Sequence, residues 1–501
     1  MPSCEYLLGI DVGTEGCKSL LFNFKGKSVA RSYSEYSVVV PESSWAEQDP
    51  LLWWESVRGS IREVVKKARV SAGDVVCVSL TGQSPVMVGV DEKGKPMMNA
   101  IIWMDRRAVK EAKKLLKLTG LKEDPSMILP KIMWLKEHRP NIFRQTHKLL
   151  QATDFVGYQL TRKFATDPVT ASTIHYDAEK RKYPLNVLRE LQIPLEKLPN
   201  VHFPTESNDT VSEEASRLTG LRVGTPVVLA GIDAYMALIG VNALQPGRAC
   251  EITGTSTCIM VPSRKKIMDP EARIECSPFP SVPNLWILWG MMSSTGASLS
   301  WYRDNFGGRE SFSEIDAEAA EVPPGSQGLI FLPYMMGERS PIWDASARGV
   351  FAGLSLNHTR KHFARGILEG CAFGIRHNLE AIEGLGGKIT GMWSCGGAAS
   401  SRIFGQIKAD VLGKSIIIPK EIEAPALGSA IIGAVNIRVY KNLAQAAKSM
   451  VSTDCIIPTQ KSVHEKYERF FRMYKDLYPP LKEFFRRYYK DQTAHKTKRE
   501  T

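Results

Sequence analysis

The sequence predicts an α/β protein with two domains. Its 501 residues exceed what one hydrophobic core normally supports, so two large domains are expected. Apolar runs at residues 75–80 and 227–232 have the composition of strands buried on both faces, as in a parallel sheet. Segments 51–69 and 361–383 carry apolar residues at helical spacing, and Asp49 and Pro50 supply a cap and first residue for the former.

The N-terminal segment predicts a strand, a tight turn and a returning strand. An apolar run at residues 7–10 leads to Asp11, and Gly13 and Gly16 bracket the turn that follows. Such a turn directs backbone N–H groups and the Thr14 hydroxyl toward one point, which suits a phosphate. The Asp11 carboxylate suits a hydrated magnesium ion. The alternative is an ordinary hairpin with an aspartate at its turn.

A second segment about half-way along the chain repeats this pattern. Residues 251–257 combine a short strand, a glycine and a run of hydroxyl side chains. Two phosphate loops, one in each half, predict a cleft that closes over a nucleotide. The sequence has no Gly-x-x-x-x-Gly-Lys-Ser/Thr motif, which excludes a P-loop enzyme.

A second acid follows a buried strand. Asp233 comes directly after the apolar run 227–232 and before residues with helical spacing. From spacing alone two roles stay open: the cap of the following helix, and a catalytic base. Polar residues 81–84 follow strand 75–80, at the end of a strand where α/β sheets usually bind ligands.

The second half predicts the domain boundary and a further glycine-rich loop. Residues 245–247 mark the boundary, which gives domains 1–245 and 246–501. Segment 396–401 opens a helix with two glycines, so a ligand can approach its backbone closely. We expect residues 464–490 to form a pair of helices before a disordered basic tail. Segment 185–223 is predicted to be rich in loops.

The distribution of charge and the number and spacing of cysteines bear on which molecules the protein binds and on its cellular compartment. The net charge of +12 is concentrated in segments 106–122 and 482–501, which would suit RNA, acidic surfaces or anionic substrates. Solvated helix faces explain this excess of basic residues better, because the sequence lacks the combination of aromatic and basic residues that is typical of RNA-binding domains. The nine cysteines have no zinc spacing, and no signal peptide or membrane-spanning run is present. These features predict a cytoplasmic protein without nucleic-acid or membrane partners.

Taken in order, these motifs resemble the FGGY family of carbohydrate kinases, within the actin-like ATPase superfamily. The resemblance runs from about residue 7 to residue 435 and includes features typical of xylulokinase-like members. Its further motifs are segments 45–50, 53–54, 130–135, 332–334, 337–341, 349–354 and 368–370.

The resemblance implies two actin-like (ribonuclease H-like) domains that flank a deep catalytic cleft. ATP would contact mainly the second domain and the sugar or polyol the first, with Asp233 as general base and Asp11 organising Mg²⁺. We expect these two acids to face each other across the gap between the domains. A homodimer is one expected assembly. Nucleotide contacts are expected from Gly13, Thr14, Lys18, Gly254, Thr255, Gly296, Ser300, Gly397, Ala398 and Ser401. Substrate contacts are expected from Gln83, Ser84, Trp103, Asp105 and Asp233, although Trp103 is equally suited to a core position.

Departures from the family pattern bear on the substrate. Glycerol kinases carry Arg-Glu where Ser84 and Pro85 stand, which disfavours glycerol. Xylulokinases carry Met-His there and usually an asparagine where Ala234 stands, so one or two sugar contacts are missing. Glu15 adds a negative charge to the first phosphate loop.

We therefore expect ATP-dependent phosphorylation of a sugar or polyol hydroxyl, with a ketopentose such as xylulose as the favoured substrate. Alternatives are erythritol, gluconate or ribulose, or a catalytically weak sugar-binding regulator on the same fold. An RNA-associated protein that uses the basic tail ranks last.

Overall fold

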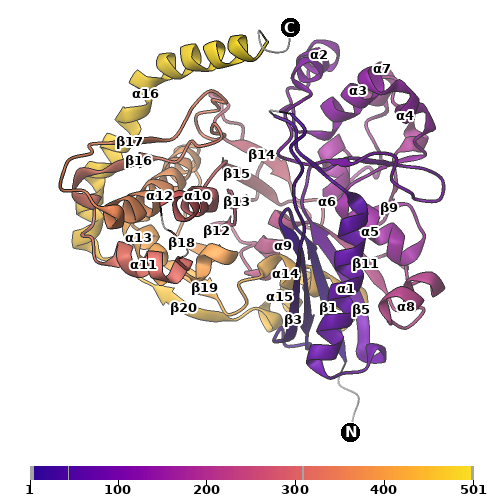
Figure 1. Cartoon of the computed structure of the whole chain (residues 1–501). Helices are drawn as coiled ribbons and strands as arrows, with labels where there is room; N and C mark the ends of the chain where they lie inside the picture. The colour runs from indigo at the N-terminus through magenta and orange to yellow at the C-terminus, as the bar shows by residue number, and fades with distance from the viewer. Residues whose placement is uncertain (1–4, 43, 307, 309, 498–501) are drawn as a thin grey trace. The chain divides into compact units, whose positions relative to one another are not determined.

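The computed structural model describes residues 5–42, 44–306, 308 and 310–497 (Figure 1). By its internal contacts the chain forms two units, which we describe separately. Unit 1 comprises Met1–Asn242, Phe279–Pro283 and Ala424–Val451. Unit 2 comprises Ala243–Pro278, Asn284–Glu423 and Ser452–Thr501.

This division corrects the predicted domains 1–245 and 246–501. The chain leaves unit 1 after Asn242, close to the expected boundary, but the segment Ala424–Val451 returns to it. Close packing explains the return. Helix α14 (Ala424–Asn436) lies against α9 (Asp233–Gly240), and a Cβ atom at Gly428 would come within 1.9 Å of the Met236 carbonyl oxygen. Only a glycine allows two helices to approach this closely at that point.

Unit 1 is built on a five-stranded mixed sheet. In spatial order the strands are β11 (Val227–Ile232), β5 (Val75–Gly82), β1 (Tyr6–Val12), β2 (Gly16–Phe22) and β3 (Ser28–Glu35). Strands β1, β5 and β11 run parallel, whereas β2 and β3 are antiparallel to their neighbours. The predicted N-terminal hairpin of β1 and β2 is confirmed, with Asp11 opposite Lys18.

Helices cover both faces of this sheet. Leu8 and Ile10 of β1 belong to the buried cluster of α1 (Pro50–Ala68), whereas a Cβ atom at Gly9 would meet the backbone of α14. Because successive strand residues face opposite sides, α1 and α14 lie on opposite faces. Helix α1 begins as predicted, with the Asp49 carboxylate accepting the Leu51 N–H at 2.9 Å.

The rest of unit 1 consists of short elements, and several of them surround a second buried cluster. Segment 185–223, predicted to be rich in loops, also contains α7 (Leu185–Glu190) and α8 (Glu213–Thr219). The other elements are β4 (Glu47–Gln48), β6 (Val88–Val90), β7 (Ala100–Ile101), α2 (Val109–Thr119), α3 (Ile128–His138), α4 (Pro140–Gln145), β8 (Lys148–Leu150), α5 (Ala152–Thr161), β9 (Ala165–Thr166), α6 (Pro168–Ala171), β10 (Asn200–Val201) and α15 (Leu443–Met450).

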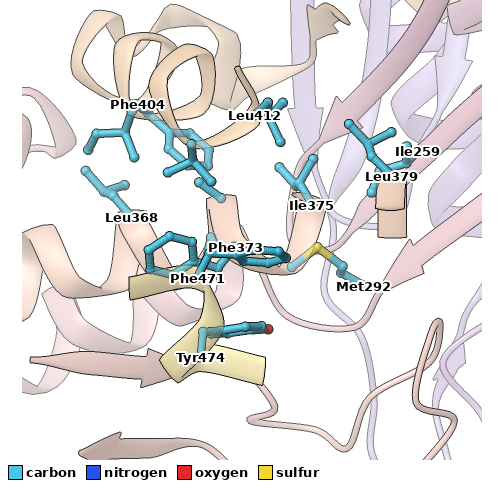
Figure 2. Close-up of a cluster of buried hydrophobic side chains, with 14 of the residues drawn as sticks. Ile259, Met292, Leu368, Phe373, Ile375, Leu379, Phe404, Leu412, Phe471 and Tyr474 are labelled. Atoms are coloured by element: carbon cyan, nitrogen blue, oxygen red, sulfur yellow. The ribbon is translucent and has the colours of Figure 1, made fainter. Parts of the chain in front are cut away.

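Unit 2 is built on a seven-stranded sheet packed against helices. In spatial order its strands are β14 (Glu275–Pro278), β15 (Trp286–Met292), β13 (Thr257–Ser263), β12 (Arg248–Thr253), β18 (Gly391–Cys395), β19 (Ile416–Pro419) and β20 (Thr453–Ile457). The remaining elements include α10 (Gly296–Phe306), α11 (Phe312–Ala320), β16 (Ile330–Leu332), β17 (Val350–Ala352), α12 (Arg360–Gly384) and α13 (Arg402–Leu412). In the core, Phe373 of α12 lies beside Phe471 and Tyr474, with ring centroids 6.0 and 5.6 Å away (Figure 2).

The C-terminal region corrects the prediction of two helices and a disordered tail. One helix, α16 (Lys461–Thr497), contains both Pro479 and Pro480, and it includes most of the basic tail. Its buried aromatic residues keep helical spacing on both sides of these prolines, so one packed face continues through them. They are Tyr467, Phe471, Tyr474, Tyr478 and Phe485. The last four residues of the tail lie outside the described residues. No helix among the described residues is long and apolar enough to cross a membrane.

Candidate active site

The two predicted acids lie at one edge of the sheet of unit 1. Asp11 on β1 is opposite Thr81 of β5, and Gly231 on β11 is opposite the same residue. Asp233 follows two residues later, at the carboxyl end of β11. Because β5 alone separates β1 from β11, these backbones are about 10 Å apart. Both acids belong to unit 1, as the predicted domain 1–245 implied, but they lie at one edge of a single sheet instead of facing each other across a gap between the domains.

A glycine shapes the junction that presents Asp233. Gly231 has a φ of 135°, which side chains other than glycine rarely adopt. A Cβ atom here would also lie 3.1 Å from the Val169 Cβ atom. The Thr81 hydroxyl donates to the Gly231 carbonyl oxygen at 2.8 Å and holds this bend to the neighbouring strand.

Asp233 is the first residue of α9, and the cap of this helix is Ile232. The helix-cap alternative for Asp233 is therefore wrong. Its Oδ1 atom accepts the Ala234 N–H at 2.7 Å. Burial raises the pKa of Asp233 to about 6, against the lowering effects of the Ala234 N–H and of the Lys18 charge. Such a carboxyl is mostly ionised at neutral pH and is a better proton acceptor than an ordinary aspartate.

Side chains from other parts of unit 1 hold the predicted first phosphate loop in place. The Gly13 N–H donates to the Gly16 carbonyl oxygen at 3.0 Å, which closes the turn. The Gln83 Nε2 atom donates to the Gly13 carbonyl oxygen at 3.2 Å. The Trp103 indole N–H donates to the Thr14 hydroxyl at 2.8 Å, and that hydroxyl donates to the Gln83 Oε1 atom at 3.3 Å. Gln83 and Trp103, both expected at the sugar, thus contact the phosphate loop.

Two other residues expected at the sugar differ in what they can offer it. The Ser84 hydroxyl donates to the Gln151 Oε1 atom at 2.7 Å, which leaves its oxygen lone pairs as acceptors. Asp105 is fully buried. Its carboxylate accepts the Ala46 N–H at 2.7 Å and three N–H groups of Arg107 at 2.8 to 3.0 Å. We infer that Asp105 supports the loop around Trp103 rather than binding sugar.

Sequence reasoning assigned no role to Lys131, which lies in the motif at residues 130–135. Its fully buried ammonium donates to the carbonyl oxygens of Pro85 and Ile102, both at 2.9 Å. Lys131 thus joins the chain just after Ser84 to the chain just before Trp103. Burial lowers the pKa of Lys131 to about 7. The signal in the sequence was a lysine inside the otherwise apolar run 128–135.

Three predicted nucleotide loops meet within unit 2. The Gly296 N–H donates to the Gly254 carbonyl oxygen at 3.1 Å, and the Ala297 N–H donates to the Thr255 carbonyl oxygen at 3.0 Å. The parallel pairing of β12 with β18 brings the loop after Cys395 to the same edge. That loop contains η5 (Gly397–Ser400), and hence Gly397 and Ala398. Two further residues of unit 2 were predicted to contact the nucleotide. Ser401 caps α13, where its hydroxyl accepts the Phe404 N–H at 3.1 Å, and Ser300 lies within α10.

Comparison with known proteins assigns the chain to a family. The model of the N-terminal domain of the FGGY family of carbohydrate kinases matches residues 6–240, and that of the C-terminal domain matches residues 250–437. This chain is an FGGY-family carbohydrate kinase. Xylulose kinase from Bacillus subtilis is 27% identical over 491 residues, which cover 96% of this chain and 98% of that protein.

Solved structures of similar kinases share the fold along nearly the whole chain. Gluconate kinase from Lactobacillus acidophilus has a TM-score of 0.85 at 26% identity and covers 95% of this chain and 98% of its own. Ligand-bound xylulose kinase from the same organism has a TM-score of 0.85 at 25% identity, and the match covers 97% of this chain and 100% of that kinase. The expected two-domain, actin-like fold is thereby confirmed.

FGGY kinases use ATP with Mg²⁺, and the residues of unit 1 fit such an ion. Asp11 is only 9% exposed, and it lies at the carboxyl edge of the parallel strands, where α/β sheets usually bind ligands. Among the described residues no group of three or more His, Cys, Asp or Glu side chains could hold a metal ion. One carboxylate with water and phosphate oxygens is the usual environment of Mg²⁺ beside a nucleotide. Asp11 would hold the ion there, and the ion would neutralise phosphate charge.

A buried ion pair lies beneath the nucleotide loops of this FGGY kinase. Lys408 and Glu251 are both fully buried and form a direct ion pair. Glu251 accepts the Thr253 hydroxyl, and hydrogen bonds of 2.8 Å continue to Thr257 and Thr295. The ion pair therefore lies at one end of a hydrogen-bonded chain that reaches the residue before Gly296.

Replacing Lys408 with methionine is expected to destabilise unit 2 by about 3–5 kcal/mol, because Glu251 is left as an uncompensated buried charge. Thermal melting measures this loss. The double variant Lys408→Met with Glu251→Gln removes that charge and should recover most of the stability. Equal melting temperatures for the single and double variants would contradict this explanation.

Proposed function

We propose that this FGGY kinase transfers the γ-phosphoryl group of ATP to a hydroxyl of a ketopentose such as xylulose, with Asp233 as general base. The observation that carries the proposal is the carboxyl of Asp233, with its pKa raised to about 6, at the same sheet edge as Asp11. Phosphoryl transfer needs positioned groups and neutralised charge more than a strong base, and a carboxylate suffices for that step.

In the proposed reaction, the sugar hydroxyl oxygen forms a bond to the γ-phosphorus as the bond to the bridging oxygen of ADP breaks. The hydroxyl proton passes to the Asp233 carboxylate. Burial raises the pKa of Asp233, and the Ala234 N–H and the positive charge of Lys18 both oppose this rise by favouring the ionised carboxylate. Ser84 would accept a hydrogen bond from a second sugar hydroxyl.

The ketopentose proposal is supported by similarity to xylulose kinases over almost the full length of both chains. Gluconate is the second candidate, because gluconate kinase matches this structure as well as xylulose kinase does. A site that lacks a hydrogen-bonding group for one substrate can favour another, and Ala234 and Pro85 offer no side-chain hydrogen bond.

The test is ADP release with ATP, Mg²⁺ and a panel of xylulose, ribulose, erythritol, gluconate and glycerol. We expect the highest kcat/KM with a ketopentose and no turnover of glycerol. The highest kcat/KM with gluconate would overturn the ketopentose proposal in favour of the second candidate. Saturable sugar binding without turnover across the panel would instead support the regulator hypothesis.

A further inference from the structure

We infer that Gln48 positions the first phosphate loop, so that the backbone N–H groups of Thr14 and Glu15 point toward the transferred phosphoryl group. Gln48 lies in β4, within the motif at residues 45–50, and is 1% exposed. The inference rests on the proposed function, and it assigns Gln48 and Gln83 to the phosphate side of the site.

The orientation of the Gln48 amide is fixed by its partners. The Trp53 indole N–H can only donate, and it lies 3.1 Å from the Gln48 Oε1 atom. The Gln83 Nε2 atom donates to the same oxygen at 2.7 Å. The Gln48 Nε2 atom therefore faces the Thr14 carbonyl oxygen, to which it donates at 2.7 Å.

The preceding carbonyl group of the loop is held in a similar way. The Gly13 carbonyl oxygen accepts the Gln83 Nε2 atom at 3.2 Å and the Tyr36 hydroxyl at 2.6 Å. Two successive carbonyl groups of the loop, those of Gly13 and Thr14, are thus engaged by side chains within unit 1. Gln48 contacts one of them directly and orients Gln83, which contacts the other.

Peptide geometry converts these contacts into a direction for the N–H groups. In a trans peptide the C=O and the following N–H point in opposite directions. The Thr14 N–H is therefore directed away from Gln83, and the Glu15 N–H away from Gln48. Successive N–H groups with a common direction form an anion-binding concavity. Without Gln48, the Thr14 carbonyl group is free to rotate toward the phosphate and repel it.

The test compares Gln48→Glu, Gln48→Met and Gln159→Met in the full-length protein, with the best sugar from the panel. Gln48→Glu places an oxygen against the Thr14 carbonyl oxygen, and Gln48→Met removes the donor at nearly constant volume. Gln159 on α5 is the matched control, because it is also buried and, within the described part of the chain, its amide oxygen accepts one side-chain N–H, from Arg162 at 3.3 Å. Melting temperatures verify that each variant is folded.

We expect kcat to fall about 100-fold in both Gln48 variants, at the lower end of the loss seen when one donor to a transition-state oxyanion is removed. The KM for sugar and the Kd for ADP should stay within about threefold, which a general loss of structure would not produce. Gln48 variants with kcat within threefold of wild type, or an equal loss in Gln159→Met, would overturn the inference. Either result leaves the proposed function intact, because that depends only on turnover by the unaltered enzyme.

Discussion

Replacing Asp233 with asparagine is expected to lower kcat for sugar phosphorylation by about 10³-fold, within the range that general-base catalysis supplies. Asparagine keeps the shape of the side chain and can still accept the Ala234 N–H, but it cannot accept the proton of the sugar hydroxyl. Coupled detection of ADP measures the rate. The KM for ATP should change little, because its expected contacts are mainly in unit 2.

Asp410 provides the matched control for this variant. It is 3% exposed in α13, and burial raises the pKa of its carboxyl as well. Its contacts are hydrogen bonds to Gln460 and Gln406, which an asparagine oxygen can also accept. Asp410→Asn should retain near wild-type kcat. If Asp233→Asn keeps a tenth or more of the wild-type kcat, Asp233 is not the base.

Replacing Asp11 with asparagine is expected to raise the Mg²⁺ concentration needed for half-maximal activity by about 10- to 100-fold. This is the usual loss of metal affinity when a residue that contacts the ion's ligands or bound water is replaced. The neutral amide loses the charge that attracts the ion while keeping the size of the side chain. Activity at graded Mg²⁺ concentrations measures the shift. An unchanged Mg²⁺ dependence would exclude Asp11 from the metal site.

The same substitution at Asp91, aspartate to asparagine, provides the control for Asp11. Asp91 caps an exposed turn, where its Oδ1 atom accepts the N–H groups of Lys93 and Lys95. Asp91→Asn removes one acidic charge from the same unit and should leave the Mg²⁺ dependence unaltered. A similar shift in both variants would indicate a general effect of charge rather than a site at Asp11.

Local patterns were sufficient to predict the elements that carry the acids. The hairpin around Gly13, the helix that Asp49 caps and the strand before Asp233 each depend on residues close together in the sequence. The meeting of Asp11 and Asp233 at one edge depends on the order of β1, β5 and β11, which no local pattern specifies. That is why the sequence led us to expect two acids facing each other across a gap, and not two acids at one edge of the same sheet.

Partners distant in the sequence decided most of the site. Gln83 was expected at the sugar, but its amide reaches Gly13 and Gln48, which are 70 and 35 residues away. Asp105 follows an apolar run and was expected to bind the sugar, but its carboxylate oxygens accept hydrogen bonds from Arg107 and from the Ala46 N–H. The return of α14 to unit 1 follows from packing at Gly428, which composition does not reveal.

The central claim is that the carboxyl of Asp233, with Lys18 near it, accepts the proton of the sugar hydroxyl. Its most direct test is the pH dependence of kcat/KM for the sugar, which reports the free enzyme. Activity should rise with pH through about 6, because only the ionised carboxylate is a base. Lys18→Met removes a positive charge that lowers this pKa and should move the rise to higher pH, whereas Lys18→Arg should not. A profile that is flat from pH 5 to 8, or one that Lys18→Met leaves unmoved, would contradict the assignment.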